Sequence, residues 1–65
     1  MTVDDIREEI LKIYAERDDP EVAHGMEDDL RDSVLSEIAE GSENAQALAK
    51  AVLETSDMNF SRWCA

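Results

Sequence analysis

The chain is predicted to be all-α, a small three-helix bundle with a C-terminal aromatic tail packed on it. Three segments repeat apolar residues every three or four positions, which is the spacing of one face of a helix. Helix signals separate them, with Asp19 and Pro20 starting the second segment and Gly41 closing it. Because 65 residues can bury only one small core, we expect a single helical domain over residues 1–65.

The first helix is expected over residues 3–17. Thr2 lies three residues before Asp5, which closely resembles the capping-box pattern of a helix start. Acidic side chains crowd the first turns, where the helix dipole favours negative charge. The helix should end before Pro20, because the residue that precedes a proline is pushed out of helical geometry. The predicted apolar face comprises Val3, Ile6, Ile10, Ile13 and Tyr14.

The second helix is expected over residues 20–40. Its apolar stripe comprises Val22, Met26, Leu30, Val34 and Ile38, widened by Leu35 and Ala39. Gly25 interrupts the pattern, because a glycine inside a helix costs about 1 kcal/mol relative to alanine. A steady spacing of four also drifts around a helix of 3.6 residues per turn. We therefore expect a bend or a break near residues 24–25.

The third helix is expected over residues 43–55. Ser42 follows the helix-closing glycine and can accept a hydrogen bond from the free N–H groups of the next helical turn. The predicted apolar face comprises Ala45, Leu48, Ala49, Val52 and Leu53. Alanines on that face would let the helix approach its neighbours closely.

The tail, residues 56–65, carries Phe60 and Trp63, an aromatic density found nowhere else in the chain. Two interpretations are open. The two rings could plug the open end of the bundle, with Arg62 turned toward the acidic helices, since aromatic burial is a large stabilising contribution for a small core. They could instead anchor a partner, because Trp and Arg are enriched at binding hot spots.

Acidic residues dominate the charge of the chain, with 17 acids against 6 basic residues and a formal net charge of -11. Phosphate backbones and anionic membranes repel such a surface, so we expect neither direct nucleic-acid binding nor membrane binding. The acids either solubilise the chain or engage a basic patch on a partner protein, for example by imitating nucleic acid. The candidate partner-binding residues are Asp18, Asp19, Glu21, Glu27, Asp28, Asp29 and Asp32.

Cys64 is the only cysteine, so no internal disulfide can form and a reducing compartment fits the chain. The N-terminal stretch lacks the basic region and apolar run of a secretory signal. No apolar run approaches the length that spans a membrane. These features predict a cytoplasmic protein.

His24, Glu27 and Asp28 are spaced so that a helix would present all three from one side. Such a set could hold a divalent metal, although a tight zinc site usually has more protein ligands. The alternative is that His24 forms a local hydrogen bond beside Gly25 while the acids lie in water. No nucleophile elbow, phosphate loop or paired-cysteine pattern is present. We therefore predict no catalytic residues, no cofactor and no enzymatic activity.

Three motifs occur together in the part of the chain that follows Arg17. They are an A-H-x-x-E-D segment (Ala23, His24, Glu27, Asp28), an L-x-x-x-V-L segment (Leu30, Val34, Leu35) and an aromatic-x-R-W ending (Phe60, Arg62, Trp63). As a set, they resemble a group of small uncharacterised acidic helical proteins of actinobacteria and their bacteriophages, for which no activity is established. The resemblance implies a bacterial or phage source. It also implies one spatial cluster, structural or functional, of His24, Glu27, Asp28, Arg62 and Trp63, which Phe60 would join in a folded-back tail.

Together these observations predict a non-enzymatic protein-protein interaction or regulatory module. It would be phage-encoded, act in the cytoplasm of a bacterial host cell, and bind a protein with a basic patch through its acidic face. A metal-binding helical module is one alternative. Another is a self-associating structural protein, because a bundle of this size can need a second copy to complete its core.

Overall fold

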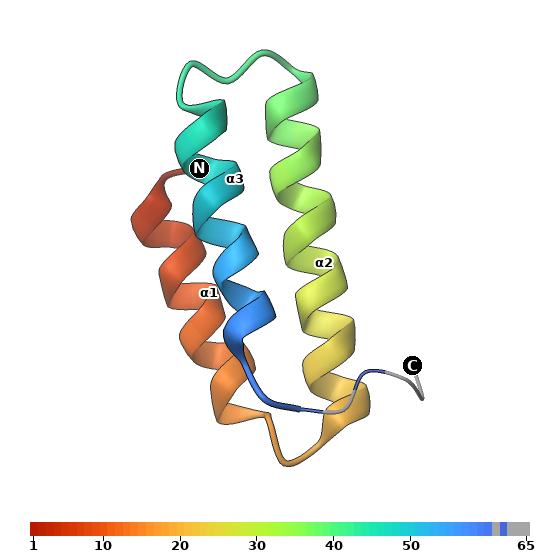
Figure 1. The fold of residues 1–65 in the computed structure, drawn as a ribbon. Coiled ribbons are helices and arrows are strands. Elements are labelled where there is room, and N and C mark those ends of the chain that lie inside the picture. Colours follow the sequence, from red (N-terminus) through yellow and green to blue (C-terminus); the bar gives the residue numbers. More distant parts are fainter. Residues whose placement is uncertain (61, 63–65) are drawn as a thin grey trace.

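The helices of the chain pack side by side as an elongated three-helix bundle (Figure 1). The structure, a computed structural model, describes residues 1–60 and 62. Within that part of the chain no strand occurs, and each helix contacts the other two, so the predicted all-α fold is confirmed. In chain order the elements are α1 (Val3–Ala15), α2 (Pro20–Ala39), α3 (Ala45–Leu53) and a short 3₁₀-helix η1 (Glu54–Asp57).

The path of the chain brings its end back to the start of α2. Helices α1 and α3 run in the same direction, and α2 runs antiparallel to both (Figure 1). After η1 the chain leaves the end of α3 and crosses toward the N-terminal half of α2 (Figure 1). Consequently, Arg62 lies against Glu27, although 35 positions separate them in the sequence.

Helix α1 begins with the cap that the sequence predicts. The Oγ1 of Thr2 accepts a hydrogen bond from the backbone N–H of Asp5 at 3.1 Å, and the Asp5 carboxylate accepts from the N–H of Thr2 at 2.8 Å. The helix ends at Ala15, before the expected residue 17. The N–H groups of Glu16 and Arg17 bond to carbonyls three residues back, so the last turn tightens instead of continuing as α-helix.

Helix α2 starts as predicted and runs without interruption. Asp19 accepts from the N–H of Val22 at 3.4 Å, and Pro20 occupies the first turn. The expected break at Gly25 is absent, because buried contacts on both sides outweigh the low helix propensity of glycine. At its end, Gly41 adopts the left-handed conformation with φ of 93°. Among the described helices, none is long and apolar enough to cross a membrane.

The third helix is shorter than expected and starts without the predicted serine cap. Asn44 occupies the N-cap position, but no side chain caps the helix. The hydroxyl of Ser42 instead donates to the side-chain oxygen of Asn44, so these two side chains satisfy each other rather than the helix. After Leu53 the backbone tightens into η1, whose Thr55 hydroxyl donates to the carbonyl of Val52 at 2.9 Å.

The core is small and includes alanines that the periodicity did not single out. Its fully covered apolar side chains are Ile6, Ile13, Ala23, Leu30, Val34, Leu48, Ala51 and Val52. Half-buried side chains packed around them are Val3, Ile10, Met26, Ile38, Met58 and Phe60. Five residues assigned to apolar faces are exposed instead, namely Tyr14, Val22, Leu35, Ala39 and Leu53. The buried line of α2 follows positions 23, 27, 30 and 34, so Val22 lies outside it.

Candidate functional site

A buried carboxylate lies at the centre of the candidate site. The side chain of Glu27 is only 3 % exposed, on the face of α2 that also carries Ala23 and Leu30 into the core. The prediction that Glu27 belongs to an outer, partner-binding face is therefore wrong. Its position follows the 3.6-residue repeat of the buried line, in which a charged side chain is tolerated only when partners satisfy it.

Arg62 supplies those partners and ties the tail to α2. Its Nε donates to Oε1 of Glu27 at 2.9 Å and its Nη2 donates to Oε2 at 3.1 Å, which is the bidentate geometry of a strong charge-assisted pair. The same guanidinium donates to the backbone carbonyls of Thr55, Met58 and Phe60 at 2.9–3.2 Å. It also stacks 3.9 Å from the centre of the Phe60 ring. One side chain thus organises the backbone of residues 55–60.

These contacts decide the protonation of Glu27. Burial by itself raises the pKa of a carboxyl group, because it penalises the charged form. The hydrogen bonds from Arg62, together with the charges of Arg62 and Arg31, outweigh burial and hold the pKa of Glu27 below its ordinary value of 4.5. Glu27 is therefore ionised at neutral pH and forms a true ion pair with Arg62.

A second arginine reinforces the junction between α2 and η1. Nη2 of Arg31 donates to the hydroxyls of Thr55 at 2.9 Å and Ser56 at 3.1 Å, and it lies 4.0 Å from Oε2 of Glu27. Thr55 is completely buried. The sequence spacing indicated the proximity of Glu27 and Arg31, but no sequence signal indicated Thr55, whose burial depends on how η1 folds back.

The predicted histidine-carboxylate group is only partly assembled. Nε2 of His24 lies 3.5 Å from the carboxylate of Asp28, one turn along α2. Both oxygens of Glu27 are engaged by Arg62, so Glu27 does not join them as a third ligand. In residues 1–60 and 62, no group of three or more His, Cys, Asp or Glu side chains is placed to hold a metal ion. The predicted roles of Trp63 and Cys64 lie outside the described residues.

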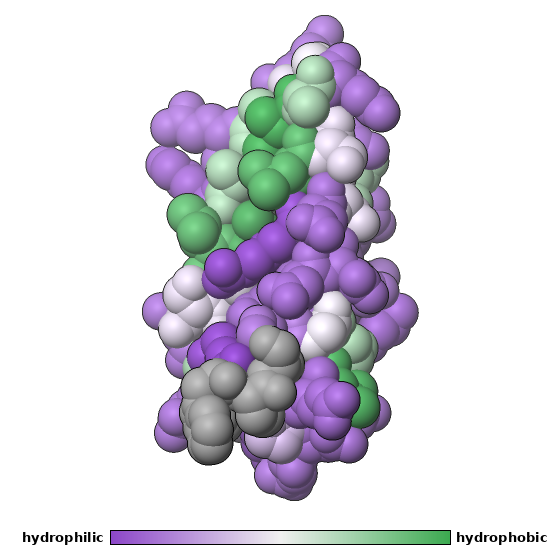
Figure 2. Space-filling model, turned by 90° about the vertical axis from the view of Figure 1, so that its right-hand side faces the viewer, coloured by the Kyte–Doolittle hydropathy of each residue, from purple (hydrophilic) through white to green (hydrophobic). Residues whose placement is uncertain are grey.

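The other predicted partner-binding acids are all exposed. We call them the acidic face: Asp18, Asp19, Glu21, Asp28, Asp29 and Asp32. They lie on the loop before α2 and on the solvent side of that helix. Figure 2 looks onto the side of the molecule where α2 lies and shows it as largely hydrophilic. The structure therefore places six of the seven predicted residues at the surface, and Glu27 inside.

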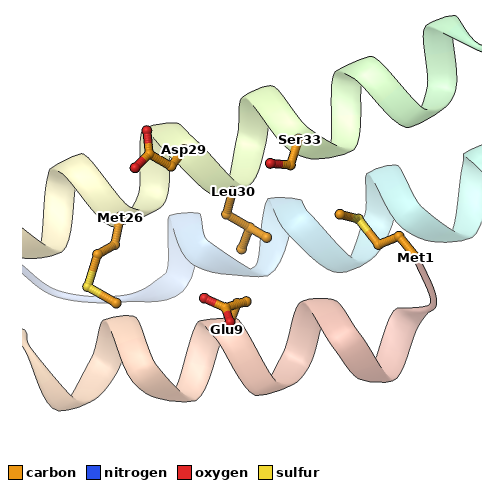
Figure 3. Close-up of a pocket in the computed structure, with 6 residues that line it drawn as sticks. All are labelled: Met1, Glu9, Met26, Asp29, Leu30 and Ser33. Carbon is orange, nitrogen blue, oxygen red and sulfur yellow. The ribbon is translucent and has the colours of Figure 1, made fainter.

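A shallow hollow of about 220 Å³ lies between α1 and α2. Figure 3 shows Met26 and Leu30 extending from α2 toward α1, above Glu9. The Glu9 carboxylate already accepts a hydrogen bond from Lys12 at 2.9 Å. The described lining thus combines apolar side chains with two carboxylates, of which Glu9 is already engaged by Lys12, and it contains neither a cysteine nor a histidine. The remaining lining residues are Met1, Asp29 and Ser33.

A second hollow, the α2/α3 groove, has an apolar lining and a volume of about 260 Å³. Its lining comprises Arg31, Val34, Leu35, Ile38, Ala49, Val52 and Leu53. Leu35 is 62 % exposed and Leu53 is 59 % exposed, so the expectation that both belong to the core is wrong. Each widens its helix stripe toward a side that no other described element covers. An apolar area is visible in the upper half of Figure 2.

Comparison of the chain with protein-family models, with curated proteins and with solved structures found no match. The interpretation of the surface therefore rests on geometry and charge. Two exposed features share helix α2, namely the acidic face and the α2/α3 groove. The same helix carries Glu27, whose ion pair with Arg62 joins α2 to the chain that follows η1.

Proposed function

We propose that the protein is a non-enzymatic protein-binding module whose acidic face engages a basic patch on a partner protein. The single observation that carries the proposal is the exposure of six carboxylates on one loop and one side of one helix. Glu27 is not part of this surface, because it is engaged internally by Arg62. Its role is to hold the tail, and thereby the end of the bundle, in a fixed arrangement.

The acidic face is electrostatically unbalanced, which supports binding to a cation. Among the described residues, no basic group lies within ion-pair distance of five of its carboxylates, and only Asp28 has a partner, His24. Asp28 and Asp32 are one helical turn apart, a spacing at which like charges destabilise a helix. A positively charged partner would relieve this repulsion and would be steered to the face by the net charge of -11.

The cellular setting of the proposal follows from sequence features. The A-H-x-x-E-D segment and the aromatic-x-R-W ending support a phage-encoded protein acting in the cytoplasm of a bacterial host. The single cysteine suits a reducing compartment. The charge argues against direct contact with nucleic acid, so the partner is a protein. Imitation of a nucleic-acid backbone is one way in which the face would recognise a nucleic-acid-binding protein.

The test compares two variants that neutralise the same number of acids. One converts every residue of the acidic face to its amide, and asparagine at position 19 still caps α2. The matched control converts six acids elsewhere, namely Asp4, Glu8, Glu37, Glu40, Glu43 and Asp57. Wild-type protein immobilised on a resin is used to capture the partner from an actinobacterial lysate. The purified partner is then used to measure the affinity of wild type and both variants at increasing salt.

The proposal predicts that the acidic-face variant binds at least about tenfold more weakly and that the control binds nearly as tightly as wild type. Wild-type affinity should also fall steeply as salt rises. Equal losses in the two variants would show that net charge alone matters and would contradict the proposed face. Salt-insensitive binding would contradict the proposal as well.

A further inference from the structure

The α2/α3 groove is an exposed apolar surface that the acidic-face function does not use. Leu35 and Leu53 stand on its two helices and are both more than half exposed. The rest of the lining comprises Arg31, Val34, Ile38, Ala49 and Val52. Single exposed leucines are common, but a continuous apolar lining on a small protein marks an interaction site, because covering it removes apolar area from water.

We propose that the α2/α3 groove docks one amphipathic helix of the basic partner protein. Apolar side chains of that helix, spaced one turn apart, would lie between Leu35 and Leu53, as in other helix-in-groove complexes. Its lysines or arginines would lie on the side that faces α2. The inference rests on the proposed function, because it takes the partner to be basic, and it adds where and in what form the partner binds.

Charge along the two edges of the groove selects this occupant. On α2, Asp32 precedes Leu35 by three residues and Asp28 lies a further turn back, so two exposed carboxylates continue the line of the leucine. On α3, Lys50 precedes Leu53 by three residues and is also exposed. Arg31 also lines the groove from α2, where it lies 4.0 Å from Glu27 and donates to the hydroxyls of Thr55 and Ser56. Beyond Arg31, a docked helix meets the carboxylates of Asp28 and Asp32 on the α2 edge, and it meets Lys50 on the α3 edge. Its basic residues belong on the α2 edge, within reach of those two carboxylates.

A second copy of the chain fits the groove less well. Each copy carries a formal net charge of -11. Two copies therefore repel each other when they come closer than the distance over which salt screens their charges. Apolar contact at one groove would have to overcome that repulsion. The negative field that repels a second copy of the chain attracts a basic helix. This difference favours the basic helix as the occupant of the groove.

The probe is a synthetic helical peptide of about four turns, with leucines at one-turn spacing and lysines along one flank. A peptide of the same composition in scrambled order is its control. Nitrogen–proton chemical shifts of the whole protein are recorded during titration with each peptide. The proposal predicts shifts that concentrate at Leu35, Ile38, Ala49 and Leu53 with the patterned peptide, and weaker, scattered shifts with the scrambled one.

Substitutions in the groove then show which side chains contribute to the affinity for the patterned peptide. The double variant Leu35→Ser/Leu53→Ser should bind the patterned peptide at least about tenfold more weakly. The matched control Leu11→Ser changes a leucine that is 69 % exposed on α1, away from the groove, and should bind like wild type. Asp28→Asn/Asp32→Asn should weaken binding and reduce its dependence on salt.

The outcomes separate this inference from the proposed function. Suppose that the leucine variant binds the peptide and the purified partner like wild type, while the acidic-face variant binds neither. The groove proposal would then be overturned, and the acidic-face function would be supported. If only the leucine variant loses binding, the groove is a docking site, but the acidic-face function and the assignment of a basic helix to the groove are both overturned. Sedimentation of the protein alone should show a monomer. A dimer that Leu35→Ser/Leu53→Ser separates would make a second copy the occupant and overturn the proposal.

Discussion

Glu27 on α2 and Arg62 in the tail form a bidentate ion pair, with nitrogen-to-oxygen distances of 2.9 and 3.1 Å. The carboxylate is almost completely buried, whereas the Arg62 side chain remains 31 % exposed. The guanidinium of Arg62 therefore lies over the Glu27 carboxylate on the solvent side and neutralises its buried charge. Because Arg62 also donates to the carbonyls of Thr55, Met58 and Phe60, the same side chain links the backbone of residues 55–60 to α2.

The first prediction concerns pH. The folded protein holds the pKa of Glu27 below its ordinary value, so the ion pair contributes its full stability above that value, near pH 4.5. The contribution is lost as the pH falls further, through the lowered pKa of the folded state. Urea unfolding should therefore show a gap between wild type and Glu27→Gln that is largest near neutral pH and narrows in acid.

Comparison with Glu27→Gln is needed because protonating the other acids also relieves repulsion within the chain, and both proteins share that effect. The difference in unfolding free energy isolates Glu27. A gap that is independent of pH from neutral to well below the ordinary carboxyl pKa would mean that Glu27 does not titrate differently in the folded and unfolded states.

The second prediction concerns Gly25. A side chain added at this position would meet no atom within 4 Å, and α2 is continuous through it. Gly25→Ala should therefore raise the free energy of unfolding by about 1 kcal/mol, and the melting temperature by about 4–8 °C. Thermal unfolding followed by circular dichroism measures this directly.

Gly41 provides the control for that experiment. Its φ of 93° lies in the left-handed region, where alanine is strained although space is available. Gly41→Ala should lower stability by about 1 kcal/mol, opposite in sign to the change at Gly25. If Gly25→Ala destabilises instead, α2 is bent or broken at that point in solution.

The third prediction tests whether Phe60 is structural. The ring is half-buried, packs against the core and stacks on the Arg62 guanidinium. Phe60→Ala should lower the free energy of unfolding by about 1–2 kcal/mol, less than for a fully buried phenylalanine. Phe60→Leu should recover much of the loss. Unchanged stability in Phe60→Ala would favour the alternative interpretation, in which the ring serves as an anchor for a partner.

Much of the fold could be predicted from the sequence because the relevant signals are local. The Thr2 cap, the Asp19–Pro20 helix start and the left-handed Gly41 each depend on a few neighbouring residues. The predicted Ser42 cap also fails for a local reason, because the Ser42 hydroxyl donates to the side chain of Asn44. The low helix propensity of Gly25 did not predict the structure there, because the buried residues on either side of it keep α2 continuous.

The candidate site was harder to predict, because periodicity carries no information on contacts between residues far apart in the sequence. The motif resemblance alone grouped Glu27 with Arg62. Whether Glu27 faces water or the core depends on an arginine 35 residues away, and periodicity treats every carboxylate as a solvent residue. The exposure of Leu35 and Leu53 has a similar cause. A helix pattern shows how wide the apolar stripe is, but it does not show which part of the stripe the other two helices cover.

The most direct test of the account is a double-mutant cycle on Glu27 and Arg62, measured by urea unfolding at neutral pH. Arg62→Met in the wild-type background removes the bidentate partner of a buried carboxylate, leaves Arg31 at 4.0 Å from it, and should lower stability by about 3 kcal/mol. In the Glu27→Gln background the same change should cost less, giving a coupling energy of at least about 1 kcal/mol. Losses that add to within about 0.3 kcal/mol would mean that the two side chains act independently, and would contradict the closure of the tail by this pair.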